Sequence, residues 1–124
     1  MERIAFIEGF KKRTKLFALR IIRLYQSLPK SGEAQVLGKQ LLRSAISVAA
    51  NYRAVCRART KAEFVSKMGV VVEEADESVF WIELLIEANI VKGEKLKELI
   101  DEANEILSIV SAARKSASIK DSLK

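Results

Sequence analysis

Residues 39–61 read KQLLRSAISVAANYRAVCRARTK, and this stretch decides how the chain can fold. An α-helix turns by about 100° per residue, which places the large apolar side chains of this stretch on one side and its basic side chains on the other. Only Ile46 and Ala50 lie between the basic residues, so no acidic side chain interrupts them. We expect one face to pack in a core and the other to bind an anionic partner. The apolar face comprises Leu37, Leu41, Val48, Tyr52 and Val55, and the basic face, here called the basic strip, comprises Lys39, Arg43, Arg53 and Arg57.

The composition is typical of one folded helical domain. Of 124 residues, 49% are apolar and 31% are charged, with five Gly and one Pro, which excludes disordered and fibrous classes. Apolar runs contain only a few residues, far below the roughly 20 that cross a bilayer. The start, MERIAFIEGFKKR, has none of the features of a signal peptide. We therefore expect a cytoplasmic protein that does not contact membranes.

The chain lacks the residues on which most catalytic and metal sites depend. It has no His and a single Cys, Cys56, which excludes an internal disulfide and leaves a zinc site without its ligands. Without His, the usual general acid or base is also missing. We predict no catalytic residue, no metal, no cofactor and no small-molecule substrate.

Positive charge is concentrated in the first half of the chain. Residues 1–61 contain 14 Lys and Arg against 3 Glu, a net charge of +11, whereas residues 62–124 contain 8 against 13 Asp and Glu, a net charge of −5. This asymmetry indicates either a polyanionic partner for the basic half or contact between the basic half and the acidic half of a neighbouring copy.

Four helices are predicted from apolar residues spaced alternately three and four apart. Pro29 ends the first helix, because proline disfavours helical geometry in the residue before it. Thr60 and Glu63 have the spacing of a capping box, so the third helix should begin at Thr60. Gly93 separates the third helix from the fourth. The helices cover approximately residues 3–28, 33–58, 60–89 and 93–115.

Short turns between these helices imply antiparallel neighbours. The predicted fold is therefore all-α, an antiparallel up-down-up-down four-helix bundle over residues 1–115. We expect the fourth helix to end near Arg114 or Lys115 and residues 116–124 to form a frayed or disordered tail.

Asn51 lies at the edge of the packing side of the second helix, where a covered amide needs a hydrogen-bond partner. One interpretation is a bond to another helix or to water. The other is that Asn51 fixes the helix register or the oligomeric state, as a single buried Asn does in coiled coils.

The third helix is apolar on nearly all sides in its second half. Opposite its core-facing residues lie two acids followed by large apolar side chains, which together would form an adhesive patch if exposed to water. We therefore expect a homo-oligomer with this face at the interface, where the acids could meet basic residues of a neighbour. The predicted interface residues are Glu73, Glu77, Phe80, Trp81 and Leu84.

The chain resembles the four-helix-bundle proteins encoded in intervening sequences of 23S ribosomal RNA genes. The resemblance is based on Arg43, Ala45, Ser47, Val48 and Asn51 in the second helix, followed by Lys61, Glu63 and Phe64 at the start of the third. It continues through Glu73–Glu77 and Phe80-Trp81 to Leu84-Leu85. Where many members continue with Ile-Ala-Glu-Gly, this chain has Tyr52-Arg53-Ala54-Val55, which exchanges an acid for positive charge.

The resemblance implies a bundle that is the subunit of a ring-shaped homopentamer. The chain is also similar to the accessory protein of diversity-generating retroelements, a basic pentamer that binds nucleic acid and a reverse transcriptase. These likenesses imply a fold and a genomic setting, and no catalytic activity.

Three functions compete for these features. The first is binding of RNA or DNA through phosphates, since nothing in the sequence indicates a base-reading motif. The second is a protein-interaction scaffold, in which the basic face docks an acidic partner or a neighbouring subunit. The third is a di-metal enzyme using Glu73, Asp76, Glu77 and Glu83, which is disfavoured because these acids share one helix and no His completes the set. The predicted nucleic-acid contacts are Lys39, Arg43, Arg53, Arg57, Arg59, Lys61, Lys12, Lys15 and Arg23.

Overall fold

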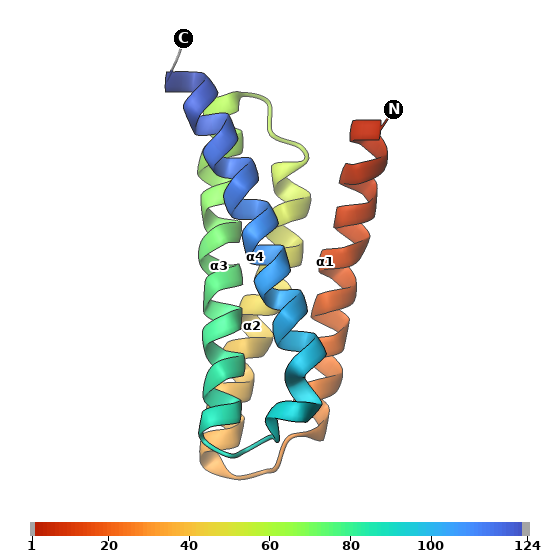
Figure 1. Cartoon of the computed structure of the whole chain (residues 1–124), viewed down its shortest axis with the longest axis vertical. Coiled ribbons are helices and arrows are strands. Elements are labelled where there is room, and N and C mark those ends of the chain that lie inside the picture. Colours follow the sequence, from red (N-terminus) through yellow and green to blue (C-terminus); the bar gives the residue numbers. More distant parts are fainter. Residues whose placement is uncertain (1, 123–124) are drawn as a thin grey trace.

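The computed structural model describes residues 2–122, which form four α-helices and no strands (Figure 1). Consecutive helices run in opposite directions, and both ends of the described chain lie at the same end of the bundle. The predicted all-α, antiparallel up-down-up-down bundle is therefore confirmed. The helices are α1 (Glu2–Ser27), α2 (Gly32–Val55), α3 (Lys61–Glu87) and α4 (Gly93–Ser122).

The helices surround one core in a square arrangement. α2 packs against α1 and α3, and α4 packs against α3 and α1, so α1 and α3 lie at opposite corners. Each helix contributes apolar side chains spaced three and four apart, and their burial removes apolar surface from water, which stabilises the fold. The most completely buried large side chains include Phe17, Ile21, Leu41, Ile82, Leu85 and Ile106.

α1 and α2 approach closely at the turn that joins them. A Cβ atom on Gly38 would lie 2.6 Å from Leu28 Cδ1 and 2.9 Å from Tyr25 Cδ1, so the missing side chain is what lets the helices meet here. The Tyr25 hydroxyl donates to Gln35 Oε1 at 2.9 Å, and Gln35 Nε2 donates to the Pro29 carbonyl at 2.9 Å. These bonds fix the turn after Pro29.

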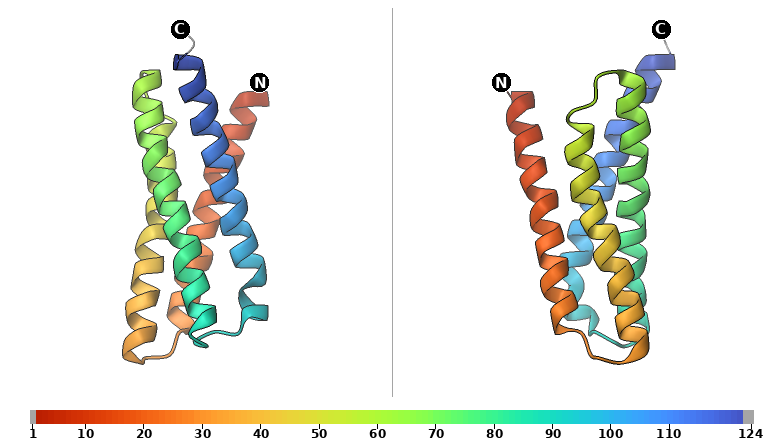
Figure 2. Two further views of the ribbon diagram at one scale, coloured as in Figure 1. Left: turned by 60° about the vertical axis from the view of Figure 1, so that its left-hand side comes forward. Right: turned by 180° about the vertical axis from the view of Figure 1, so that it is seen from behind.

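At the opposite end, α1 stands away from α2 (Figure 2). Aromatic rings fill the space between the two helices there: Phe10 of α1 meets Tyr52 of α2 edge to face, with ring centroids 4.8 Å apart. Phe6 stacks on Phe10 at 5.9 Å. Glycine at one end and aromatic rings at the other make the two helices diverge.

The start of α3 follows the predicted capping box. The Glu63 amide donates to Thr60 Oγ1 at 3.0 Å, and the Arg59 amide donates to Glu63 Oε2 at 3.4 Å. The hydrogen bond from Lys67, followed by that from Arg59, lowers the pKa of the Glu63 carboxyl. Thr60 is thus the N-cap, and the first helical residue is Lys61.

Two predicted helix ends are wrong. α2 ends at Val55 and not near residue 58, because the Arg57 and Ala58 amides bond three residues back in a tighter turn. α4 does not end near Arg114 or Lys115 but continues to Ser122, since no Gly or Pro follows Gly93 to interrupt it. Residues 123–124 of the predicted tail lie outside the described residues.

The core contains a hydroxyl pair that joins α2 to α3. Ser44 Oγ and Ser78 Oγ lie 2.9 Å apart, and both residues are fully buried. Each hydroxyl also lies within hydrogen-bond distance of a carbonyl one turn back, Leu41 O or Glu74 O. With two protons for three contacts, one serine donates to the other and the second donates to its own helix.

Leu85→Ala tests the core. Leu85 is 0% exposed, so we expect the free energy of unfolding to fall by about 2–5 kcal/mol through lost burial and the cavity left behind. The same substitution at Leu16, which is 52% exposed, should change it by less than about 0.5 kcal/mol. Urea denaturation followed by circular dichroism measures both. Equal losses in the two variants would contradict the assigned core.

Candidate nucleic-acid interface

The divergence of α1 and α2 opens a groove with a volume of about 590 Å³. Its rim is basic on both sides, with Lys12 and Lys15 on α1 facing Arg53 and Arg57 on α2. Its floor is aliphatic and consists of Ala18, Leu19, Ile22, Ile46, Ala49 and Ala50. We call this feature the α1/α2 groove. Two segments far apart in the sequence thus combine their outer faces into one cationic surface.

The rim cations are not neutralised by the chain itself. Among the side chains that the structure describes, those of residues 2–119, no carboxylate forms an ion pair with Lys12, Lys15, Arg53 or Arg57. The only acidic residue lining the groove is Glu8, which pairs with Lys11 at 3.0 Å. A polyanion entering the groove therefore meets four available positive charges.

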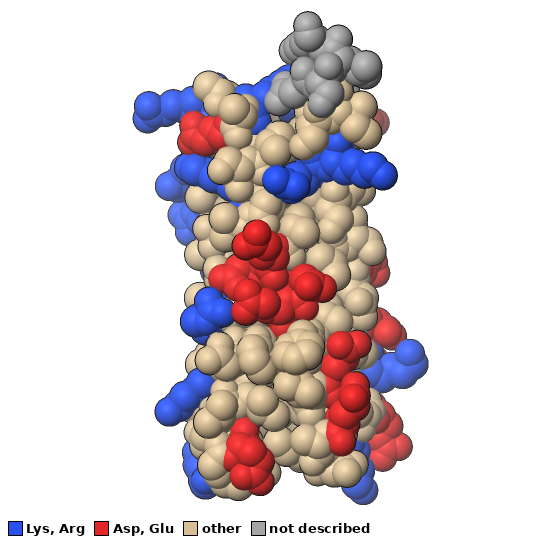
Figure 3. Space-filling model, turned by 90° about the vertical axis from the view of Figure 1, so that its left-hand side faces the viewer, with Lys and Arg blue, Asp and Glu red and all other residues tan. Residues whose placement is uncertain are grey.

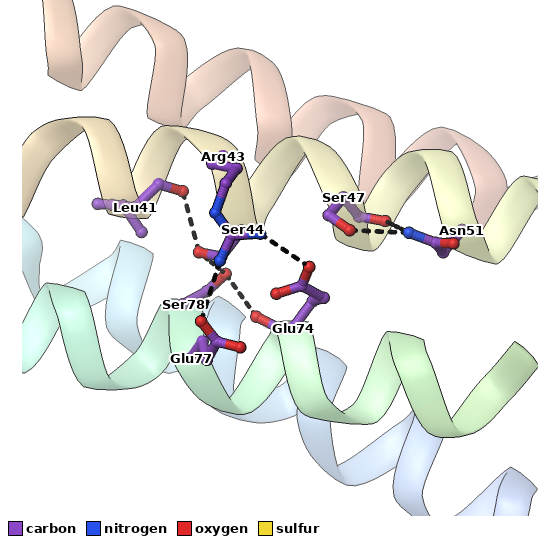
Figure 4. Close-up of polar contacts among 8 residues, drawn as sticks. All are labelled: Leu41, Arg43, Ser44, Ser47, Asn51, Glu74, Glu77 and Ser78. Carbon is purple, nitrogen blue, oxygen red and sulfur yellow. Dashed lines mark hydrogen bonds and ion pairs between the residues drawn. The ribbon is translucent and has the colours of Figure 1, made fainter.

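Arg43 differs from the rest of the basic strip, because it turns toward α3 (Figure 4). Its two terminal nitrogens lie 3.2 Å from Glu74 Oε2 and 3.1 Å from Glu77 Oε1. No acidic residue of α2 interrupts the basic strip, but two acidic residues of α3, Glu74 and Glu77, lie beside Arg43. Glu77 pairs with Arg43 within its own chain, and its contact with a neighbouring subunit stays a prediction.

The remaining predicted contacts are distributed along the bundle. Lys39 lies near the start of α2 and Arg23 near the end of α1, and both are exposed. Arg59 and Lys61 line a second hollow of about 410 Å³, where the α2–α3 connection faces Arg3 and the end of α4. The structure therefore does not gather all nine predicted cations in one site.

Asn51 has its hydrogen-bond partners on its own helix. Its Nδ2 donates to the Ser47 carbonyl at 2.9 Å and to Ser47 Oγ at 2.7 Å (Figure 4). The expected bond to another helix is therefore wrong, because one turn of α2 already supplies acceptors. A role for Asn51 in register or oligomeric state stays a prediction.

Tyr52 and Cys56 lie one turn apart at the end of α2 and remain uncharged at neutral pH. Burial, followed by the nearby Cys56 thiol, raises the pKa of the Tyr52 hydroxyl. Burial also raises the pKa of the Cys56 thiol, against a smaller opposing effect of the Tyr52 hydrogen bond. Neither group is an activated nucleophile.

The predicted interface face of α3 is only partly exposed. Phe80 is 49% exposed and meets Trp81 edge to face at 5.0 Å, whereas Trp81 and Leu84 are half-buried. The indole Nε1 of Trp81 is buried and has no hydrogen-bond partner. Figure 3 shows acidic side chains gathered at mid-height on this side of the bundle, where α3 carries Glu73 and Glu77.

The structure offers no support for a metal site or a membrane span. In the part of the chain that is described, no group of three or more acidic or Cys side chains could hold a metal ion, including the acids of α3. Among the same residues, no helix is long and apolar enough to cross a membrane.

Comparison with known proteins identifies the family. Residues 10–112 match the family described as 23S rRNA-intervening sequence protein. The chain belongs to this family. A crystal structure from Bacteroides thetaiotaomicron, of a protein with unknown function from the S23 ribosomal protein family, is 31% identical. The match covers 88% of this chain and 97% of that one, with a TM-score of 0.80. A comparison with curated proteins found no match.

Both findings agree with the family resemblance that begins at Arg43 in α2. Neither description names a catalytic activity, and the Bacteroides protein is described as having unknown function. For this member of the 23S rRNA-intervening sequence family, function must therefore be argued from the surface of the bundle.

Sequence reasoning missed one charged cluster that holds α1 in place. Arg13 binds Glu102 of α4 through two hydrogen bonds of 2.8 and 2.7 Å, and it pairs with Glu105 at 2.9 Å. The hydrogen bond to Glu102 raises the pKa of the guanidinium. The cluster is invisible along the sequence because 89 positions separate Arg13 from Glu102. Arg13 is thus a structural cation, distinct from those on the groove rim.

Arg43→Met tests whether the Arg43 cation is structural. The Glu74 side chain is only 12% exposed and its Oε1 is already buried without a partner, so removing the cation leaves a poorly solvated carboxylate. We expect the free energy of unfolding to fall by about 1–2 kcal/mol. Arg53→Met, which breaks no ion pair, should change it by about 0.5 kcal/mol or less. Chemical denaturation that gave both variants the same stability would contradict this assignment.

Proposed function

We propose that this protein is a non-enzymatic bundle that binds RNA or DNA through phosphate contacts in the α1/α2 groove. The observation that supports the proposal is a set of four rim cations, contributed by two helices, that have no carboxylate partner among the described side chains. Ion-paired arginines such as Arg13 and Arg43 would have to break existing bonds before binding an anion. The rim cations need only release counterions.

The contacts in this proposal are electrostatic and sequence-independent. The four rim side chains have flexible stems and no hydrogen-bonded support that would hold them against base edges, whereas base readout requires fixed geometry. Each contact is weak by itself. Repetition of the groove around a homo-oligomer would raise the effective affinity, provided that one polymer reaches several copies.

The competing proposal is a scaffold in which the same rim docks an acidic protein or a neighbouring subunit. The charge asymmetry of the chain is compatible with it, because α3 and α4 carry most of the acids. The two proposals differ in what is lost when the rim charges are removed.

The double variant Arg53→Gln/Arg57→Gln separates these proposals. We expect this variant to bind a 20-nucleotide RNA more weakly than the wild type. The slope of log K against log salt concentration should become shallower by about 1 for each lost phosphate contact, hence by about 2 in total. Fluorescence anisotropy between about 50 and about 300 mM salt, the range over which phosphate contacts weaken, measures both the affinity and the slope.

The matched control is Lys92→Gln/Lys95→Gln, which removes the same charge from exposed positions at the α3–α4 turn. It should retain the slope of the wild type. Equal losses in both double variants would show that net charge matters and the groove does not. Loss of assembly with Arg53→Gln/Arg57→Gln would favour the scaffold.

We also propose that the protein forms a homo-oligomer through the outer face of α3. Phe80 is a large apolar side chain that is 49% exposed, and it packs edge to face on the half-buried Trp81. A ring of five subunits, as the family resemblance implies, would repeat the α1/α2 groove five times.

Phe80→Ser tests this interface. We expect at least about a tenfold increase in the subunit dissociation constant, because a large apolar contact is lost. Leu16→Ser, at a similarly exposed site on α1, should leave assembly unchanged. Sedimentation velocity at micromolar concentration measures both, and a monomeric wild-type protein would contradict the proposal.

A further inference from the structure

We infer that the α1/α2 groove selects a single-stranded polynucleotide over a duplex, with phosphates on the basic rim and bases against the aliphatic floor. This inference deepens the proposed function and depends on it. It follows from the combination of rim and floor in one concave surface, since a basic helix face alone would accept either form.

The apolar floor of the groove indicates that the ligand has an apolar part in addition to its phosphates. Leu19 and Ile46 are 42% and 43% exposed, although both are large aliphatic side chains. Ile22 and three alanines line the same groove, and these aliphatic side chains follow the cations along the two helices toward the middle of the bundle. Water covers this surface in the free protein, so a ligand that covers it gains free energy from apolar burial.

A duplex cannot cover the floor. Its bases are stacked and paired inside, so the surface that it presents to the rim consists of phosphates and sugars. A duplex would therefore contact the cations through its phosphates and leave Leu19 and Ile46 without apolar contacts.

A single strand can satisfy both parts of the groove. Its bases are free to turn away from the backbone, and the face of each base is apolar enough to pack against protein side chains. The floor contains no aromatic ring, so stacking of the kind that favours particular bases is absent. The groove should therefore prefer single strands with little preference for sequence.

The length of the groove limits how much of a strand it holds. Its α2 side runs from Ile46 to Arg57, which corresponds to roughly 16 Å at about 1.5 Å per residue. Stacked nucleotides advance by about 3.4 Å each. Bases that pack on the floor are no longer stacked and the strand is then more extended, so one groove should hold at most about five nucleotides. The Glu8–Lys11 pair marks the end of the groove near the aromatic cluster.

The experiment compares an unstructured 20-nucleotide RNA with a blunt RNA duplex containing the same number of phosphates, both added to the intact wild-type assembly. We expect the single strand to bind about tenfold more tightly at equal salt, since only it gains contacts to the floor. The floor variant Ile46→Ser should reduce single-strand affinity about threefold to fivefold and leave duplex affinity and both salt slopes unchanged.

Val36→Ser is the matched control. Val36 is also β-branched, exposed and on α2, but it does not line the groove. It should not alter either affinity. Because both substituted positions are exposed, the folding of the variants can be verified by their unfolding curves. A 4-thiouridine RNA should crosslink to peptides containing residues 18–22 and 46–50 in the wild-type protein.

Three outcomes would overturn the inference. Equal binding of the strand and the duplex, with no effect of Ile46→Ser, would leave phosphate binding in place and remove single-strand selection. Binding of neither nucleic acid at low salt would remove the proposed function itself. Tighter binding of a synthetic amphipathic Glu/Leu helix, with displacement of the RNA, would assign the groove to an acidic protein partner.

Discussion

The divergence of α1 from α2 is the constraint on which the surface of this protein depends. Gly38 lets the helices meet at one end, and the Phe10–Tyr52 ring pair holds them apart at the other. If α1 and α2 stayed equally close along their full length, the faces that now form the groove floor would be buried between them. Instead, aliphatic side chains remain open to water beside the cations of the groove. The shape of the site thus follows from residues that lie outside it.

The same geometry divides the cations into two classes. Arg13 joins α1 to α4, and Arg43 joins α2 to α3, in both cases through carboxylates of the neighbouring helix. These bonds help to hold the corners of the bundle, and they consume the charges that make them. Lys12, Lys15, Arg53 and Arg57 face the one side where no acidic helix lies beside them. The net charge of a sequence segment does not distinguish cations that form ion pairs within the bundle from cations that remain unpaired.

Much of the fold could be predicted from the sequence because its signals are local. The three-and-four spacing of apolar residues, Pro29 and the Thr60–Glu63 capping box each act within one helix or turn. These local signals correctly predicted the four-helix bundle and the N-cap of α3 at Thr60. The ends of α2 and α4 were wrong, because a tighter final turn at Arg57 and uninterrupted helix beyond Lys115 leave no strong local signal.

The candidate site could be predicted only in part. Helical periodicity identified the outer faces of α1 and α2 as basic, but it could not show that these faces adjoin, since that depends on packing between helices. It also could not show that Arg43 turns to Glu74 and Glu77, 31 and 34 positions away. Arg53, by contrast, lies on the groove rim, in agreement with the outer face of α2 to which periodicity assigned it.

The positions of the acids limit how a polyanion could lie on the bundle. α1 and α3 occupy opposite corners, so the acidic face of α3 is remote from the groove on the α1 side. Phosphates are repelled from α3, and they are attracted to the rim between α1 and α2. If α3 forms subunit contacts, its acids are withdrawn into the interface while each groove stays open. Assembly and polyanion binding then use different corners of the same bundle, and neither has to displace the other.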